Sequence, residues 1–237
     1  MAHNYNQAIF RVERRCTMEE YVYVVISRTP TSTGKIIRRF LKGKYNHASI
    51  SLNENLSEMY SFCRLSISNP LVGGIIRESA FTLTLGLDAD VPISIYRIPV
   101  TVEKYELIRK FIYDVYNDAE VYYYNFLQAI GLISNKKHSI YKTYICSEFV
   151  MEALKQGGIE FTALNSYQVT PTDISKIMGH FLYYSGDLKN YPFKQKIKTK
   201  DDEFFFCKTG IFYEGVHTLT HFWKVMSRNR DSKRSKL

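Results

Sequence analysis

The stretch of residues 47–52, His-Ala-Ser-Ile-Ser-Leu, constrains the fold most strongly, because its residues alternate strictly in character. The even-numbered residues are apolar, and the odd-numbered ones are histidine or serine. Alternation with a period of two is the pattern of a strand that buries one face. Residues 53–55, Asn-Glu-Asn, are turn-like, and residues 57–64 have the composition of a returning strand. The pattern therefore predicts an antiparallel hairpin with His47 on its polar face.

A second stretch, residues 144–150, predicts a helix that begins at Cys146. Apolar residues follow this cysteine at i+3, i+4, i+7 and i+8, as in a helix packed on a core. A thiol at a helix N-terminus feels the positive end of the helix dipole, which favours the nucleophilic thiolate. An imidazole beside it can take the thiol proton and later return it to a leaving group. We therefore expect Cys146 to be a nucleophile and His47 its base, the alternative being that Cys146 is a buried structural residue.

A third group normally orients such an imidazole and fixes its tautomer. If residues 53–55 form a three-residue loop, His47 falls opposite Ser61 in the hairpin. A carboxylate would orient the ring more strongly, but this register places Glu58 on the opposite face. The sequence therefore predicts Ser61 as the third residue, unless a bulge in the returning strand turns Glu58 toward the site.

The polar face of the first strand also bears on where the cysteine helix packs. Ser49 and Ser51 lie on the same face as His47 and leave room for an opposing helix. We therefore expect the helix that begins at Cys146 to pack on the sheet face that carries the histidine.

Other side chains are candidates to line a pocket around the thiol. Residues 122–125, Tyr-Tyr-Tyr-Asn, lie upstream of Cys146. One of these phenols is a candidate to donate to an oxyanion, the alternative being that all three fill an aromatic core. Tyr124, Tyr45 and Glu58 are the pocket-lining residues that we expect.

Periodicity outlines the remaining elements. β-branched and aromatic residues predict further strands at residues 21–27, 91–100 and 181–184. Helical spacing predicts helices at residues 35–42, 101–118, with Thr101 as the N-cap, and 122–134. Thr-Pro-Thr-Asp at residues 170–173 opens a short helix.

Composition excludes several classes of protein. The chain has 237 residues, 45% of them hydrophobic and 15% aromatic, which is ample for the core of one large domain. Its four cysteines form no CxxC pair, which argues against zinc-ribbon and thioredoxin-like proteins. No apolar run approaches the roughly 18 to 20 residues of a membrane span, and the first residues lack the basic and apolar regions of a signal peptide. We therefore expect a soluble, cytoplasmic protein.

The net charge of +9 makes acidic partners plausible without selecting one. An anionic membrane surface is a candidate partner, and we expect no specific nucleic acid. His217 and His221 are spaced i, i+4, but no carboxylate or cysteine accompanies them in register, so we expect neither a metal nor another cofactor. The final Ser-Lys-Leu at residues 235–237 matches a peroxisomal address, but we expect so short a match to be fortuitous.

Three regions divide the chain by composition. Residues 1–20 are an N-terminal extension, and residues 21–191 carry the predicted strands, helices and site. Residues 192–237 are a C-terminal extension in which lysine and phenylalanine become frequent, ending in a basic tail that we expect to be disordered. We expect this extension to influence the choice of substrate or partner, not the chemistry.

Taken together, the histidine strand, the returning strand at residues 58–62 and the Cys-Ser-Glu helix start resemble the circularly permuted branch of the NlpC-type papain-like superfamily. That group includes YiiX-like proteins and is related to lecithin retinol acyltransferase. The resemblance covers residues 21–191. It implies an α+β papain-like fold, in which a central antiparallel sheet packs against the helix that carries the cysteine.

The same resemblance implies a thiol hydrolase or acyltransferase in which Cys146 matches the nucleophile and His47 the base. Relatives often have glutamate or histidine at the third position, where this chain offers Ser61. We therefore expect a cysteine amidase or peptidase acting on an amide or peptide through a thioester. The alternatives are a phospholipase or acyltransferase acting on an acyl lipid, and a non-catalytic binding module that retains the fold.

Overall fold

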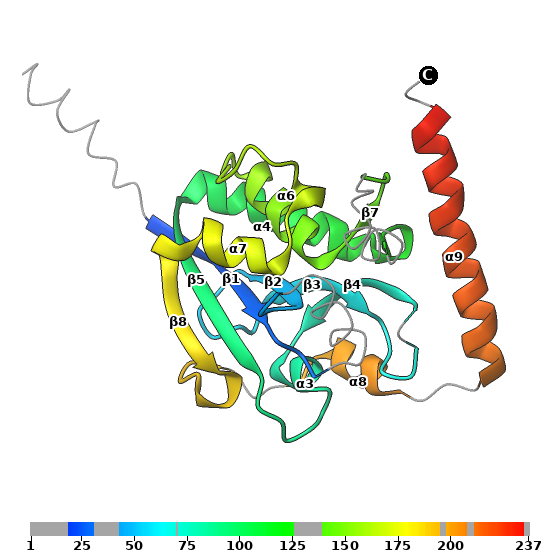
Figure 1. Cartoon of the computed structure of the whole chain (residues 1–237), viewed down its shortest axis with the longest axis horizontal. Coiled ribbons are helices and arrows are strands. Elements are labelled where there is room, and N and C mark those ends of the chain that lie inside the picture. The colour runs from blue at the N-terminus through cyan, green and yellow to red at the C-terminus, as the bar shows by residue number, and fades with distance from the viewer. Residues whose placement is uncertain are drawn as a thin grey trace, which may run out of the picture.

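The computed structural model describes residues 19–30, 43–69, 71–125, 139–194, 198–207 and 211–234, and in the last helix only the side chains of residues 214–228. Over these residues the chain is a mixed α/β protein with a mainly antiparallel sheet and several helices (Figure 1). The predicted helix at residues 35–42, the first 18 residues and the final Ser-Lys-Leu lie outside the described residues.

A six-stranded antiparallel sheet in the order β4-β3-β2-β1-β5-β8 forms the centre of the molecule. Its strands are β1 (Glu19–Ser27), β2 (His47–Ser51), β3 (Met59–Arg64), β4 (Gly73–Glu78), β5 (Pro92–Thr101) and β8 (Leu182–Asp187). β1 pairs with β5 along its whole length, from Glu19 opposite Thr101 to Ser27 opposite Ile93. These two long strands are rich in the β-branched and aromatic residues that favour a pleated, buried surface.

Three helices cover one face of this sheet (Figure 1). They are α4 (Val102–Asn117), α6 (Cys146–Gln156) and α7 (Pro171–Ile177). Ile50 and Phe62 of the sheet belong to the same buried cluster as Phe149 and Val150 of α6. The apolar stripe predicted after Cys146 is therefore the surface by which α6 is attached to the sheet.

A second buried cluster lies on the opposite face. It contains Val25 and Ile95 from the central strands and Leu83 from α3 (Ala80–Thr84). Ser79 caps α3, because its hydroxyl accepts the backbone N–H of Phe81 at 3.0 Å. This cap follows the last residue of β4 directly, so it holds that end of the strand in place.

Most predicted elements are present with boundaries shifted by a few residues: β1, β2, β3, β5, β8, α4, α6 and α7. Thr101 caps α4 as predicted, since its hydroxyl accepts the backbone N–H of Lys104 at 3.4 Å. The predicted helix at residues 122–134 is wrong in its described part, where β6 (Tyr123–Tyr124) pairs in parallel with β7 (Thr143–Tyr144). β4 and α3 were not predicted from the sequence.

The hairpin of β2 and β3 is confirmed, but its predicted register is wrong by two residues. Ile50 lies opposite Tyr60, whereas a three-residue loop would pair it with Glu58. The turn is wider because the side-chain oxygen of Asn53 accepts the backbone N–H of Glu58 at 3.3 Å. A shift of two residues leaves each side chain on its predicted face, so Ser61 still shares the face of the histidine.

The helix α8 (Lys200–Phe206) of the C-terminal extension packs against the sheet. Phe205 of α8 is only 2% exposed, and its carbonyl accepts the backbone N–H of Ile67 at 2.9 Å. The hydroxyl of Ser79 donates to Asp202 at 2.6 Å. α8 therefore supports the end of β4.

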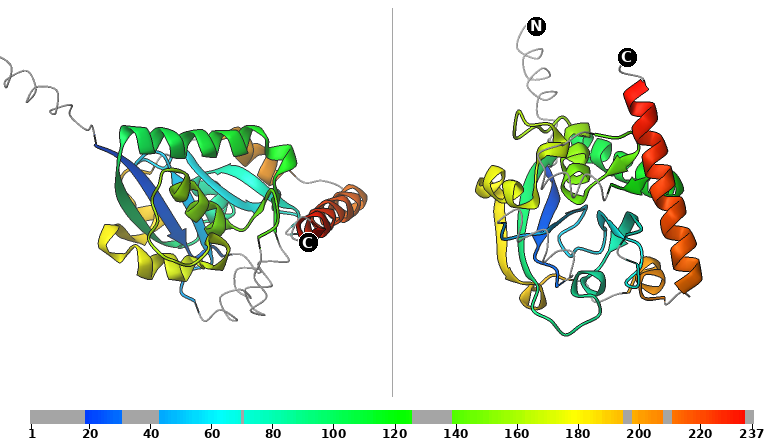
Figure 2. Two further views of the ribbon diagram at one scale, coloured as in Figure 1. Left: turned by 90° about the horizontal axis from the view of Figure 1, so that it is seen from above. Right: turned by 45° about the vertical axis from the view of Figure 1, so that its right-hand side comes forward.

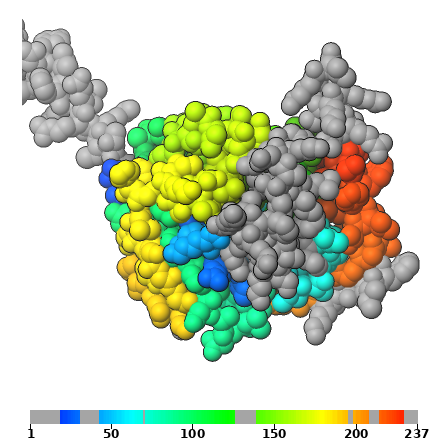
Figure 3. Space-filling view, in the orientation of Figure 1, coloured from blue at the N-terminus to red at the C-terminus, as the bar shows by residue number. Residues whose placement is uncertain are grey.

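The last helix, α9 (Ile211–Arg234), runs along one side of the molecule (Figure 2). Asn69 donates to the hydroxyl of Thr218 at 2.9 Å, and His221 packs edge-on against Tyr123 with ring centroids 5.3 Å apart. In the space-filling view α9 forms the right-hand edge of the molecule (Figure 3). None of the helices that the structure describes combines the length and the apolar character needed to cross a membrane.

Candidate active site

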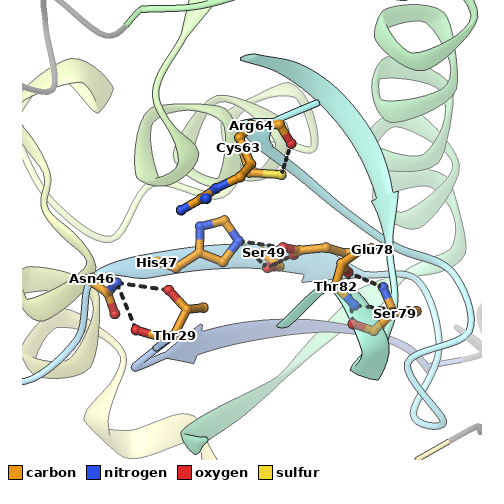
Figure 4. Close-up of polar contacts among 9 residues, drawn as sticks. All are labelled: Thr29, Asn46, His47, Ser49, Cys63, Arg64, Glu78, Ser79 and Thr82. Carbon is orange, nitrogen blue, oxygen red and sulfur yellow. Dashed lines mark hydrogen bonds and ion pairs between the residues drawn. The ribbon is translucent and has the colours of Figure 1, made fainter. Parts of the chain in front are cut away.

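His47 is the first residue of β2, and it faces Glu78, the last residue of β4, across the intervening strand. The His47 Nε2 and Glu78 Oε1 atoms are 2.8 Å apart (Figure 4). The hydroxyl of Ser49 donates to the second carboxylate oxygen, Oε2, at 2.5 Å. His47 is 8% exposed and Glu78 is 3% exposed. The sheet therefore holds an imidazole and a carboxylate in a fixed, buried alignment.

The two groups form an ion pair at neutral pH, because their attraction outweighs the cost of burial. Burial lowers the pKa of His47, but the Glu78 charge and hydrogen bonds with Cys146 and Glu78 raise it well above the ordinary 6.5. Burial raises the pKa of Glu78, but the His47 cation and hydrogen bonds with His47 and Ser49 bring it below the ordinary 4.5. His47 therefore enters any reaction as an imidazolium.

Cys146 lies beside this imidazolium at the first position of α6 and is 7% exposed. The proximity of Cys146 contributes to the raised pKa of His47. Because Nε2 is occupied by Glu78, Nδ1 is the ring nitrogen left for the thiol. The first helical hydrogen bond of α6 runs from Phe149 N to Ile145 O at 3.0 Å, so the backbone N–H of Cys146 precedes the helical ladder. The helix N-terminus and the imidazolium both stabilise negative charge at this sulfur.

The predicted side of the sheet for the cysteine helix is wrong. α6 packs against Ala48 and Ile50, which point away from the face of His47 and Ser49. The cysteine still reaches the histidine because both residues stand at the ends of their elements, His47 opening β2 and Cys146 opening α6. α6 therefore packs on the apolar face of the sheet, whereas Cys146 and His47 meet at the end of β2.

The structure places Glu78, not Ser61, beside the histidine as the third residue. Ser61 is fully buried, and its hydroxyl makes no hydrogen bond of good geometry among the described residues. It lies close enough to Glu78 to help lower the pKa of that carboxyl. Ser61 thus lies next to the carboxylate that contacts His47.

Two of the expected pocket-lining residues have polar partners outside the group of His47, Glu78 and Cys146. The phenol of Tyr113 donates to Glu58 at 3.0 Å. The hydroxyls of Tyr45 and Ser94 are 2.7 Å apart, and Tyr45 is 5% exposed in the core beneath the helices.

Tyr124 of β6 does lie near the thiol, as expected. Burial raises the pKa of its phenol, and the proximity of Cys146 and Cys63 raises it further. The phenol is therefore a neutral hydrogen-bond donor at ordinary pH. Burial, followed by the Glu78 charge, raises the pKa of Cys63 well above its usual value, so this second thiol at the site stays protonated.

Glu78, the carboxylate beside His47, was not predicted from the sequence. Its strand reads Gly-Gly-Ile-Ile-Arg-Glu, which starts with two glycines and lacks clear alternation. The available signal was that a carboxylate ends an apolar segment and directly precedes Ser79, a helix-capping residue type. Among the described residues, no group of three His, Cys, Asp or Glu side chains could hold a metal ion.

Comparisons with known proteins leave the geometry of this site as the basis for any functional conclusion. No family model, curated protein or solved structure matches the chain.

Proposed function

We propose that this protein is a cysteine hydrolase of the amidase or peptidase type, with Cys146 as nucleophile, His47 as acid and base, and Glu78 as the residue that orients His47. The observation that carries the proposal is the alignment of these three side chains, which come from α6, β2 and β4. The proposal also retains the resemblance of the chain to the permuted NlpC-type papain-like proteins. In that family a carboxylate at the third position is common.

The reaction begins with attack of the Cys146 thiolate on the substrate carbonyl, which forms a C–S bond and moves the carbonyl electron pair onto oxygen. We assign the backbone N–H of Cys146 and the phenol of Tyr124, which lies near Cys146, as the donors to that oxyanion. Collapse of the intermediate breaks the bond to the leaving amine, which takes its proton from His47. The neutral imidazole then removes a proton from water as the water attacks the thioester, which breaks the C–S bond, releases the acid and restores the thiolate and the imidazolium.

The buried carboxylate favours this proposal over a binding module that merely retains the fold. A buried charge is costly unless it is paired and hydrogen-bonded, and Glu78 is satisfied by His47 and Ser49. An aliphatic residue at position 78 would hold β4 in the sheet equally well. Catalysis supplies a reason for a carboxylate at this position, because it keeps His47 protonated and correctly oriented.

Intact-mass labelling with p-nitrophenyl butyrate tests the proposal. We expect one butyryl group on Cys146, released again by hydroxylamine as a thioester would be. Cys146→Ala and His47→Ala should abolish this product, whereas Cys207→Ala, which removes an exposed thiol, should leave it unchanged. Acylation confined to Cys207, or acylation of Cys146 that does not depend on His47, would reject the hydrolase.

A second candidate function, transfer or hydrolysis of lipid acyl chains, is favoured by the outer surface of α9. Leu219, Phe222 and Trp223 are 72%, 51% and 67% exposed, and exposed apolar side chains on a basic helix are typical of contact with an anionic bilayer. Trp223 is the single tryptophan of the chain, so its fluorescence reports on this surface. A blue shift with phosphatidylserine vesicles but not with phosphatidylcholine vesicles would support the lipid candidate, and no shift with either would reject the bilayer contact.

A further inference from the structure

Arg64 is the last residue of β3, and among the described residues its charge has no carboxylate partner. The ion pairs in this part of the chain involve other side chains. Burial lowers the pKa of the guanidinium but leaves it charged at any ordinary pH.

Two side chains, Cys63 and Tyr124, lie near both Arg64 and the nucleophile Cys146. Cys63 lies close enough to Arg64 and Cys146 for both to affect the pKa of its thiol. Tyr124, from a different part of the chain, is close enough to the same two residues for both to affect the pKa of its phenol. In Figure 4 the Arg64 side chain lies on the same side of β2 as the His47 ring. The unpaired guanidinium and the reactive sulfur therefore border the same region of the molecule.

A partly buried cation without a counter-ion is unusual, because burial costs free energy that only a pairing group returns. The planar fork of a guanidinium matches the oxygens of a carboxylate or a phosphate, and it binds either with two parallel hydrogen bonds. Near a nucleophile, such a cation fixes one end of a substrate so that its carbonyl lies within reach of the sulfur.

We propose that Arg64 binds a carboxylate or phosphate group carried by the acyl substrate of Cys146. The inference rests on the proposed thiol chemistry, and it narrows the substrate to molecules with an oxyanion close to the scissile carbonyl. Arg64 then determines specificity, since a neutral analogue of the substrate would leave the guanidinium unpaired.

Competition between iodoacetate and iodoacetamide tests the proposal without a known substrate. Both reagents alkylate a thiolate with loss of iodide, but only iodoacetate carries a carboxylate. We expect the ratio of the iodoacetate rate to the iodoacetamide rate at Cys146 to fall about tenfold in Arg64→Gln, which corresponds to about 1.4 kcal/mol. Arg64→Lys should recover part of the ratio. Arg109→Gln, on the exposed side of α4, removes the same charge elsewhere and serves as the matched control.

Protection of Cys146 from iodoacetamide by added anions provides a second measurement on the unsubstituted protein. It also distinguishes a carboxylate from a phosphate as the preferred ligand. Phosphate or acetate, compared with chloride at equal ionic strength, should slow iodoacetamide labelling of Cys146, and the stronger protector identifies the preferred anion. An unchanged reagent ratio in Arg64→Gln, or a lack of protection by both anions, would overturn the role of Arg64 while leaving the thiol chemistry intact. Failure of Cys146 to react with iodoacetamide in any variant would instead reject the proposed function itself.

Discussion

Replacing Glu78 by glutamine removes the charge of the buried carboxylate and keeps its shape. At an effective dielectric constant of about 20, two unit charges about 4 Å apart attract each other by about 4 kcal/mol. Loss of one partner from a buried ion pair costs about 3 to 5 kcal/mol. Because Glu78 is 3% exposed and lies 2.8 Å from the imidazole, we expect a loss of about 3 kcal/mol, with the glutamine amide retaining part of the hydrogen bonding.

The effect depends on pH in a way that identifies the ion pair. The raised pKa of His47 stabilises the fold fully below its ordinary value of 6.5 and loses this contribution as pH rises through the folded-state value. The lowered pKa of Glu78 stabilises the fold above its ordinary value of 4.5 and loses this contribution as pH falls. The difference in unfolding free energy between the two proteins should therefore be largest between pH 4.5 and 6.5 and shrink on either side.

Urea unfolding at a series of pH values measures this difference, and iodoacetamide labelling measures the consequence for the site. With the carboxylate gone, burial is opposed only by the proximity of Cys146, so the pKa of His47 falls and labelling of Cys146 at pH 7 should slow about tenfold or more. The matched control is Glu58→Gln, because Glu58 is a carboxylate that bonds to Tyr113 and not to His47. A difference in stability that stays constant from pH 4 to 9 would refute the ion pair, and equal labelling rates would refute its role.

Three further predictions follow from the same contacts. Ser61→Ala should leave the unfolding free energy within about 1 kcal/mol or raise it, because the buried hydroxyl lacks a well-formed hydrogen bond; a large loss in urea unfolding would restore Ser61 to a structural role. Tyr124→Phe should lower turnover of an activated ester about a hundredfold, because it removes an oxyanion donor, and unchanged turnover would assign the phenol to the wall of the site only. Phe205→Ala should cost about 3 to 5 kcal/mol in urea unfolding, whereas Phe204→Ala, at a side chain that is 60% exposed, should cost less than about 0.5 kcal/mol; equal losses would contradict the packing of α8.

The sequence was sufficient to predict those elements whose pattern lies within a few consecutive turns or strand residues. Strict alternation predicted β2 with its faces, and the apolar stripe after Cys146 predicted α6, because each pattern records which side chains are buried. Thr101 was recognised as a cap because capping depends on a few adjacent residues.

The sequence was insufficient to predict those features that depend on contacts between residues far apart in the chain. Glu78 becomes the partner of His47 only because β4 pairs with β3 on the far side from β2, and no local pattern encodes that order. The hairpin register was missed because the side chain of Asn53 widens the turn, which residue types alone did not reveal. Tyr124 was expected near the site but inside a helix. It instead lies in a strand that pairs in parallel with Tyr144, and local periodicity does not record a pairing between segments separated by residues 126–138.

The chain order of the sheet and of α6 has a consequence for the newly synthesised protein. The five strands from β1 to β5 are complete at Thr101, whereas α6, which covers Ala48 and Ile50, ends at Gln156. At about 5 to 20 residues per second, a ribosome needs several seconds to produce the intervening chain. During that time the imidazole and its carboxylate can already be paired, while an apolar sheet face awaits its helix. Nascent chains arrested in this interval should therefore be the most prone to aggregate and the most dependent on chaperones.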